Sequence, residues 1–254
     1  MILDDFRLNG KVALVTGAAQ GLGQGYAIAL AEAGADIVAL DRSEVAETGK
    51  SISALGRRFM PLKSDLREAS VDDLNEIVAD IVKQMGRLDI LVNNAGIIRR
   101  TPAIDFSEKD WDDVLQINLK AAFFLSQAAA RVMLNQGGGK IINVASMLSF
   151  QGGIFVPSYT AAKSGIAGIT RALANEWAKH HINVNAIAPG YMATDNTAPL
   201  RADAARSQSI LDRIPAGRWG TPADLQGLVV FLASSAAEYV QGAIIPVDGG
   251  WLTR

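Results

Sequence analysis

The sequence KVALVTGAAQGLGQG at residues 11–25 carries the clearest signal of the fold. It starts with a short apolar run at 11–16, which is typical of a strand buried on both faces. A turn with Gly17, Gly21 and Gly23 follows and leads into a helical pattern. Glycines let a backbone turn tightly and approach a pyrophosphate, whose charge a helix N-terminus favours. Taken alone, the pattern also fits a tight strand-to-helix turn that binds nothing.

The same alternation of strand and helix continues along the chain. Further apolar runs are ADIVAL at 35–40, LDILVN at 88–93, KIINVA at 140–145 and INVNAIA at 182–188. The patterns between these runs are long enough for crossover helices. Two of these helices have start signals, Ser107 followed by Asp110, and Pro222 in the sequence TPAD at 221–224.

Repeated strand–helix units predict one α/β domain over residues 1–254. Its expected architecture is a Rossmann-type doubly wound parallel sheet with helices on both faces. In such sheets, ligands bind beyond the carboxyl ends of the strands. We therefore expect the functional residues at the ends of the apolar runs.

The composition excludes several classes of function. Hydrophobic residues make up 49% of the chain and charged residues 20%, which favours a packed core over disorder. The net charge of -2 argues against a nucleic-acid partner. The chain has no cysteine and only two histidines, the adjacent His180 and His181. No disulfide, thiolate nucleophile, metal site or Ser-His-Asp triad is therefore predicted.

The N-terminus does not resemble a targeting signal. Asp4 and Asp5 stand where a signal peptide carries positive charge, and no apolar run reaches the length of a membrane span. We therefore expect a cytoplasmic protein with no membrane partner.

Asp41 ends the second predicted strand, 18 residues beyond Gly23. The dinucleotide-binding pattern places an acid there, near the adenosine ribose. A carboxylate accepts hydrogen bonds from the ribose hydroxyls and repels a 2′-phosphate, so NAD is favoured over NADP. The neighbouring Arg42 could tolerate that phosphate, and a simple cap on the following helix is the alternative role for Asp41.

Tyr159 and Lys163 lie four positions apart in SYTAAKSG, residues 158–165. On a helix this spacing puts both polar tips on one face. Ser146 directly follows KIINVA, so its hydroxyl is expected to emerge at a strand end. Without further context, Tyr159 would be a core residue, Lys163 a solvated charge and Ser146 a cap.

The chain resembles the short-chain dehydrogenase/reductase family through motifs in the family's order and spacing. These are TGxxxGxG at 16–23, Asp65-Leu66, NNAG at 93–96, Asn118, Ser146, Tyr159 with Lys163, and PGYMAT at 189–194. The resemblance implies a nicotinamide cofactor, which with Asp41 we expect to be NAD, and often a homotetramer. It implies a proton-transfer group of Ser146, Tyr159, Lys163 and Asn118. The expected cofactor contacts are Gly17, Gln20, Gly21, Leu22, Gly23, Asp41, Asp65, Leu66, Asn93, Tyr159, Lys163 and Thr194.

The chemistry of the residues agrees with what the resemblance implies. Exchange of a hydride with a carbinol carbon needs a positioned acid/base for the oxygen, and Tyr159 supplies it. An ammonium beside the phenol, from Lys163, favours the phenolate. By resemblance, Asn118 helps to hold a water that links Lys163 to solvent, and Thr194 bonds the nicotinamide carboxamide. Asp65 and Leu66 match the pair beside the adenine ring, and Asn93 is expected to brace the central strands as well.

The substrate class comes from a closer resemblance. NNAGIIRR, ASMLSFQGG, PSYTAAKSG, PGYMATDNT and ILDRIPAGRWG resemble members of the family that act on six-carbon sugar acids. The substrate carboxylate needs a cation, and Arg100, after the NNAG turn, is the first candidate, with Arg99 beside it. Gln151 is a further substrate contact. RADAARSQSILDR at 201–213 looks like an amphipathic lid whose arginines are additional candidates.

Several alternatives stay open at this point. The arginines after the NNAG turn could be solvated or could contact another subunit. A gluconate dehydrogenase and a 3-oxoacyl-thioester reductase would use the same Ser-Tyr-Lys chemistry. A protein that senses a dinucleotide without turnover is the third possibility, although the intact Ser146, Tyr159 and Lys163 argue against it.

Overall fold

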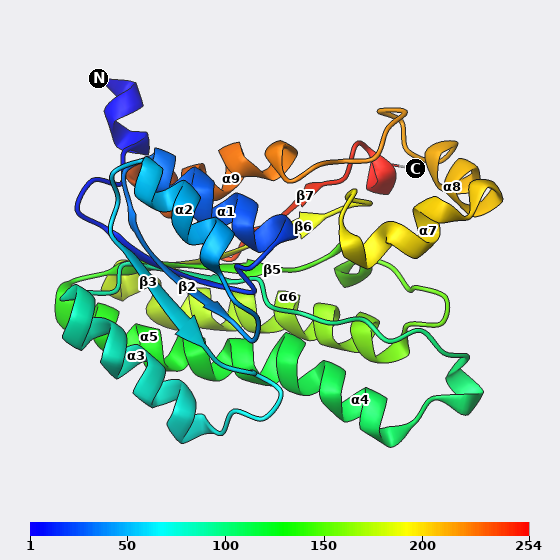
Figure 1. Cartoon of the computed structure of the whole chain (residues 1–254), viewed down its shortest axis with the longest axis horizontal. Helices are drawn as coiled ribbons and strands as arrows, with labels where there is room; N and C mark the ends of the chain where they lie inside the picture. The colour runs from blue at the N-terminus through cyan, green and yellow to red at the C-terminus, as the bar shows by residue number, and fades with distance from the viewer. Residues whose placement is uncertain (254) are drawn as a thin grey trace.

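A computed structural model describes residues 1–253 (Figure 1). Within these residues seven strands form one parallel sheet in the order β3-β2-β1-β4-β5-β6-β7. The strands are β1 Val12–Thr16, β2 Asp36–Asp41, β3 Phe59–Lys63, β4 Ile90–Asn93, β5 Gly139–Val144, β6 Ile182–Pro189 and β7 Ile244–Val247. The domain predicted over residues 1–254 ends at Arg254, which lies outside the described residues.

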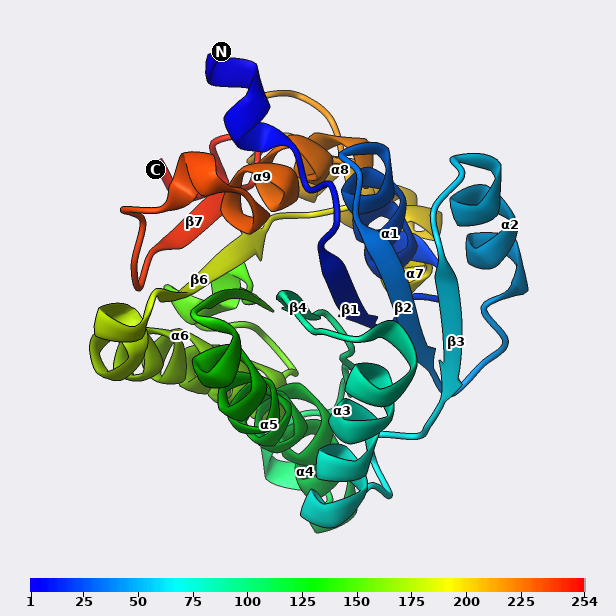
Figure 2. The same ribbon diagram turned by 90° about the vertical axis from the view of Figure 1, so that its left-hand side faces the viewer.

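Helices cover both faces of the sheet (Figure 2). One face carries α1 (Gly21–Glu32), α2 (Ala46–Ala54) and α9 (Ala223–Ala233). The other face carries α3 (Val71–Met85), α4 (Glu108–Leu115), α5 (Ala121–Gln136) and α6 (Pro157–Trp177). The predicted doubly wound sheet with helices on both faces is confirmed.

Alternation along β1 explains why both faces are covered. Ala13 and Val15 pack in the core under α1 and α9, whereas Val12 and Leu14 pack in the core under α3 and α5. Successive side chains of a strand point to opposite faces, so a continuous apolar run needs a helix layer on each side. Each fully buried Val or Leu side chain contributes about 1.5–3 kcal/mol.

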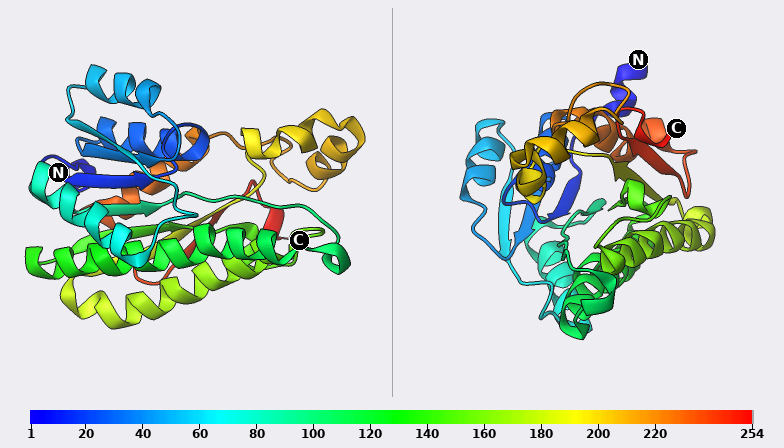
Figure 3. Two further views of the ribbon diagram at one scale, coloured as in Figure 1. Left: turned by 60° about the horizontal axis from the view of Figure 1, so that its bottom comes forward. Right: turned by 90° about the vertical axis from the view of Figure 1, so that its right-hand side faces the viewer.

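The order in which strands are added to the sheet switches sides at β1. The strands β2 and β3 extend the sheet to one side of β1, and β4 starts the other side. The loops after β1 and β4 therefore separate at their carboxyl ends, which is where doubly wound sheets bind ligands. Short helices α7 (Ala198–Ala202) and α8 (Ala204–Leu211) project beyond this end of the sheet (Figure 3).

The sequence predicted β1, β2, β4, β5 and β6 but missed the two edge strands. β3 reads FMPLK and β7 reads IIPV, and each contains a proline. Proline cannot donate to the strand ladder and is tolerated at a sheet edge, so these segments lack the signature of a central strand. The expected start of α4 is confirmed, because the Ser107 hydroxyl accepts from the Asp110 amide at 3.1 Å. Pro222 stands one residue before α9.

Among residues 1–253, none of the helices combines the length and the apolar character needed to cross a membrane.

Candidate active site

A cleft of about 1140 Å³ opens at the carboxyl ends of β1, β2, β4 and β5. Most of the residues singled out in the sequence line it. These are Gly17, Gln20, Gly21, Leu22, Gly23, Asp41, Asp65, Leu66, Arg100, Ser146, Gln151, Tyr159, Lys163 and Thr194. Asn93 and Asn118 do not line the cleft. In the part of the chain that the structure describes, no cluster of His, Asp or Glu is arranged to hold a metal ion.

The glycine-rich turn forms one end of the cleft. Gly17 and Gly21 have positive φ angles of 67° and 60°, which side chains disfavour. A Cβ on Gly23 would collide with the Gly17 carbonyl oxygen, so only glycine fits there. Gln20 precedes α1 without a side-chain cap. The first amides of α1 are therefore available to an anion.

Asn94 joins the glycine-rich turn to the loop after β4, a role that was not predicted from the sequence. Its Nδ2 donates to the carbonyl oxygens of Thr16 and Gly17 at 2.9 and 3.2 Å. The Thr16 hydroxyl accepts from the amides of Asn94 and Ala95 at 3.0 and 2.9 Å. The only available signal was the second asparagine of NNAG, directly after a strand. These bonds fix the two loops that separate where the strand order switches sides.

Asp41 combines a position in the cleft with a structural role. Its Oδ2 accepts from the Ala19 amide at 3.0 Å and its Oδ1 from the Ser43 amide at 2.9 Å. The N-cap of α2 is Val45, so Asp41 does not cap that helix. Arg42 is exposed and lines the same end of the cleft. A carboxylate and a guanidinium therefore both stand where the sequence placed the adenosine ribose.

Further along the same wall lie Asp65 and Leu66, after β3. The Asp65 Oδ1 accepts from the Arg67 amide at 3.0 Å, and Leu66 is buried. Thr194 lies against the glycine turn. A Cβ atom added to Gly21 would be 3.9 Å from the Thr194 Cγ2. These side chains surround the part of the cleft beside the first amides of α1.

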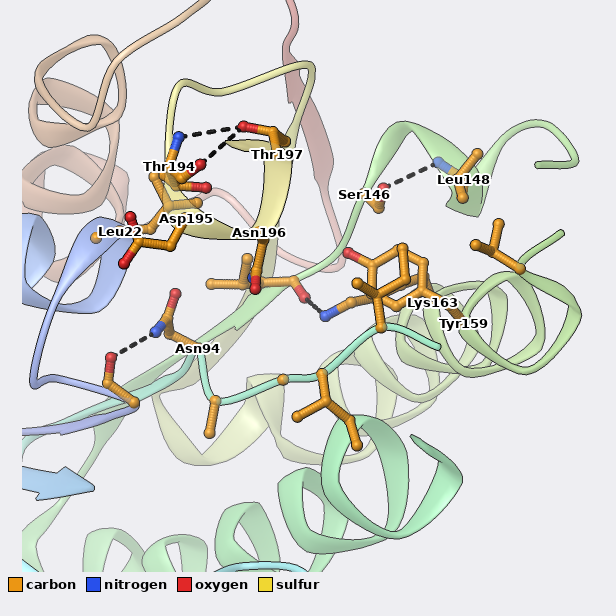
Figure 4. Close-up of a pocket in the computed structure, with 18 of the residues that line it drawn as sticks. Leu22, Asn94, Ser146, Leu148, Tyr159, Lys163, Thr194, Asp195, Asn196 and Thr197 are labelled. Carbon is orange, nitrogen blue, oxygen red and sulfur yellow. Dashed lines mark hydrogen bonds between the residues drawn. The ribbon is translucent and has the colours of Figure 1, made fainter. Parts of the chain in front are cut away.

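Ser146, Tyr159 and Lys163 meet at the other part of the cleft (Figure 4). Ser146 follows β5, and its Oγ accepts from the Leu148 amide at 3.2 Å. Tyr159 and Lys163 lie one turn apart near the start of α6, and the Lys163 Nζ is 5.6 Å from the centre of the Tyr159 ring. The Nζ also donates to the Val144 carbonyl at 2.6 Å. The strand end and the helix thus bring a hydroxyl, a phenol and an amine together.

Burial disfavours the charged form of both ionisable groups. It raises the pKa of the Tyr159 phenol, while a hydrogen bond to Ser146 and the charge of Arg100 act in the opposite direction. Burial lowers the pKa of Lys163 to about 8. Lys163 is only 4% exposed, so solvent screens its charge weakly. Small changes of charge nearby can therefore shift both protonation equilibria.

Asn118 lies in a π-helical turn, Gln116–Lys120, between α4 and α5. Its Oδ1 accepts from the Ile97 amide and its Nδ2 donates to the Ile97 carbonyl, both at 2.9 Å. Both polar atoms of this buried side chain thus hold the loop after β4. Such π-helical turns are frequent at functional sites.

The structure places Asn93 away from the expected cofactor contact. Its Nδ2 donates to the Ala122 carbonyl, the Ser126 hydroxyl and the Asn143 Oδ1, all inside the core. The side chain braces β4, β5 and α5, as the sequence also suggested. Its neighbour Asn94 faces the cleft instead, because consecutive residues at a strand end point to opposite sides.

The arginines of the cleft differ in their partners. Arg99 forms an ion pair with Asp110, with 3.1 Å between Nε and Oδ1. Arg100 donates from Nη2 to the Asn196 carbonyl at 3.3 Å. Arg213, at the end of the predicted lid, donates from Nη2 to the Gln151 Oε1 at 3.5 Å. The lid segment itself contains α8, and its Arg206 also lines the cleft, whereas Arg201 does not.

Comparison with known proteins agrees with this site. The family described as short chain dehydrogenase matches residues 11–205. The chain is 64% identical, over 100% of both sequences, to the 2-dehydro-3-deoxy-D-gluconate 5-dehydrogenases of Escherichia coli (strain K12) and Dickeya dadantii (strain 3937). A crystal structure of a putative 2-deoxy-D-gluconate 3-dehydrogenase from Agrobacterium tumefaciens, with bound NADP, is 55% identical. It superimposes with a TM-score of 0.92 over 98% of this chain and 99% of that one.

Proposed function

The chain belongs to the short-chain dehydrogenase/reductase family, and from that premise we propose that it exchanges a hydride between NAD(H) and a hexonate sugar acid. The reacting group is a secondary alcohol or its ketone. The favoured substrates are 2-dehydro-3-deoxy-D-gluconate and 2-deoxy-D-gluconate. The observation that carries the substrate class is the 64% identity over the full length of two 2-dehydro-3-deoxy-D-gluconate 5-dehydrogenases.

The residues at the glycine turn fit a dinucleotide. The lack of room for a side chain at Gly23 and the uncapped start of α1 suit a pyrophosphate that approaches the backbone closely. In this proposal the turn binds the pyrophosphate, Asp41 the adenosine ribose, Asp65 and Leu66 the adenine, and Thr194 the carboxamide. When bound, the nicotinamide ring accepts or supplies the hydride.

The proton transfer is assigned to Tyr159. In the oxidation, its phenolate oxygen takes the proton of the substrate hydroxyl, and in the reduction the phenol returns it. The Ser146 hydroxyl donates a hydrogen bond to the substrate oxygen and holds it beside Tyr159. The ammonium of Lys163, close to the ring, favours the phenolate against the effect of burial. Asn118 maintains the loop after β4, and its role in a water link to Lys163 stays a prediction.

The direct test is turnover with a panel of substrates. Purified protein is mixed with NAD or NADP and 2-deoxy-D-gluconate, D-gluconate or a sugar alcohol, and the absorbance of reduced nicotinamide is followed. Reduction of 2-dehydro-3-deoxy-D-gluconate and of a 3-oxoacyl thioester is measured in the reverse direction. We expect the deoxy-hexonate pair to give the highest kcat/KM. A higher kcat/KM for gluconate would favour a gluconate dehydrogenase, and a higher value for the thioester would favour a 3-oxoacyl-thioester reductase. Cofactor binding without turnover would favour a dinucleotide sensor.

The preference for NAD is expected to depend on the charge of Asp41. Asp41→Asn keeps a side-chain acceptor for the Ala19 or Ser43 amide but removes the repulsion of a 2′-phosphate. A charged hydrogen bond of this kind contributes about 1.5–3 kcal/mol, so the ratio of kcat/KM for NAD to that for NADP should fall roughly ten- to a hundredfold. Arg42 would then be free to pair with the phosphate.

The similar Agrobacterium tumefaciens protein was crystallised with NADP, so the choice between NAD and NADP has to be measured for this chain. Asp41→Ala is the companion variant, because it also leaves both amides without a partner and should weaken the binding of both cofactors. If Asp41→Asn leaves the NAD-to-NADP ratio unchanged, the carboxylate has only its structural role. A single domain over residues 1–254, a homotetramer and a cytoplasmic location stay predictions.

A further inference from the structure

Arg213 is held over the ring of Trp251 at the end of the cleft next to α8. Its guanidinium carbon lies 4.0 Å from the ring centre, within the range of a cation–π contact. Both residues line the cleft. No ion pair joins this guanidinium to a carboxylate among residues 1–253, and its bond to Gln151 Oε1, at 3.5 Å, is at the limit for hydrogen bonding. Most of its donors are therefore available.

Trp251 is a rigid support for this guanidinium. It is 5% exposed and packs in a small apolar cluster with Met147, Ile210 and Ile214. The Tyr191 ring meets it edge-on, with 4.8 Å between centres. Because the indole is fixed, Arg213 loses less side-chain entropy when it binds an anion than a free arginine would.

The same corner contains a second unused donor. The buried indole Nε1 of Trp251 has no hydrogen-bond partner within the described residues. A buried indole N–H usually finds an acceptor, and leaving one unpaired costs about 1–3 kcal/mol. The indole N–H is itself buried, so the donor groups at this part of the cleft wall are those of Arg213 and the amide of Gln151.

Arg100 lies in a different position relative to the chemistry. Arg100 lines the cleft together with Ser146 and Tyr159, and its charge acts against the burial that raises the pKa of Tyr159. A carboxylate bound to Arg100 would neutralise that charge and oppose formation of the phenolate. In a hexonate oxidised at a hydroxyl along its chain, the carboxylate is also separated from the reacting oxygen by several bonds. Binding of the carboxylate and support of the proton transfer therefore suit different arginines.

We propose that Arg213, supported by Trp251 and assisted by Gln151, binds the carboxylate of the hexonate, and that Arg100 acts beside the reacting oxygen. This assignment rests on the proposed function. The guanidinium exchanges its long contact with the neutral Gln151 oxygen for a charged, two-pronged contact with the substrate, which is the stronger interaction. The lid thereby recognises the acid group, while the loops after β4 and β5 hold the hydroxyl that reacts.

The experiment compares an acid with its uncharged amide. Values of kcat and KM are measured for 2-deoxy-D-gluconate and 2-deoxy-D-gluconamide in the parent and in Arg213→Ala, Arg213→Lys, Arg206→Ala and Arg100→Ala. We expect Arg213→Ala to raise KM for the acid about ten- to a hundredfold and to leave the amide within a few-fold. Arg213→Lys should be intermediate, because an ammonium keeps the charge but loses the two-pronged geometry.

The Arg206→Ala and Arg100→Ala variants test whether another arginine binds the carboxylate. Arg100→Ala should lower kcat for the acid and the amide alike. Turnover of the amide by each variant shows that its active site is folded. An unchanged acid-to-amide ratio in Arg213→Ala, or a collapse of that ratio in Arg206→Ala or Arg100→Ala instead, overturns the assignment. If the parent neither oxidises these two compounds nor reduces 2-dehydro-3-deoxy-D-gluconate with either cofactor, the proposed function fails rather than this subsite.

Discussion

Tyr159→Phe should abolish turnover while the cofactor still binds with nearly the parent affinity. The substitution removes the only atom assigned to proton transfer and leaves the ring, its place on α6 and the glycine turn intact. A positioned general acid/base contributes about 10²–10⁴ in rate, and a loss of that size in kcat is expected. The loss should occur in both directions, because oxidation and reduction use the same oxygen.

Two measurements check this prediction. The rate of nicotinamide reduction gives kcat, and titration of the protein with NAD, followed by calorimetry, gives the affinity. Tyr239→Phe is the matched control, because Tyr239 is fully exposed and does not line the cleft. Activity of Tyr159→Phe within a few-fold of the parent would remove Tyr159 from the mechanism.

Lys163→Met should also lose turnover, by about a hundredfold or more, together with part of the affinity for NAD. The ammonium is buried, close to the Tyr159 ring, and methionine has a similar length without the charge. Without that charge, burial, which is the largest influence on the pKa of Tyr159 and raises it, is opposed less and the phenol stays protonated at neutral pH. NAD affinity equal to that of the parent would confine Lys163 to an electrostatic role.

The same variant gives a second, independent readout in the pH dependence of stability. The pKa of Lys163 falls from 10.5 to about 8 on folding, so between these values the unfolded chain binds the extra proton. Stability rises with pH wherever the unfolded state binds more protons. The free energy of unfolding of the parent, relative to Lys163→Met, should therefore rise between pH 8 and pH 10.5 by up to about 3 kcal/mol.

Urea unfolding at several pH values measures this difference. Lys50→Met is the control, because Lys50 is exposed on α2 and pairs with Glu47 at the surface. Its stability relative to the parent should change little between pH 8 and pH 10.5. If the free energies of unfolding of the parent and of Lys163→Met change in parallel between pH 8 and pH 10.5, folding does not lower the pKa of Lys163.

Much of the fold could be predicted from the sequence because central strands have a local signature. The apolar run before the glycine turn is buried on both faces, and this requirement leaves a continuous pattern that needs no knowledge of the rest of the chain. The edge strands β3 and β7 could not be recognised in this way. They are only partly buried and contain Pro61 and Pro246, so their pairing depends on the neighbouring strand.

The family motifs, the spacing of Tyr159 and Lys163 on one helix face and the place of Ser146 at a strand end could all be inferred from the sequence alone. These features follow from local periodicity, which tertiary contacts do not alter. Only the tertiary structure decided that Asn94 rather than Asn93 faces the cleft, and that Asn118 is committed to the backbone of Ile97. The fold also determines which arginine lies over an indole, because Arg213 and Trp251 are 38 positions apart in the sequence and meet only through packing of the lid. Side-chain direction, desolvation and partners distant in sequence depend on the whole fold, and no local pattern contains them.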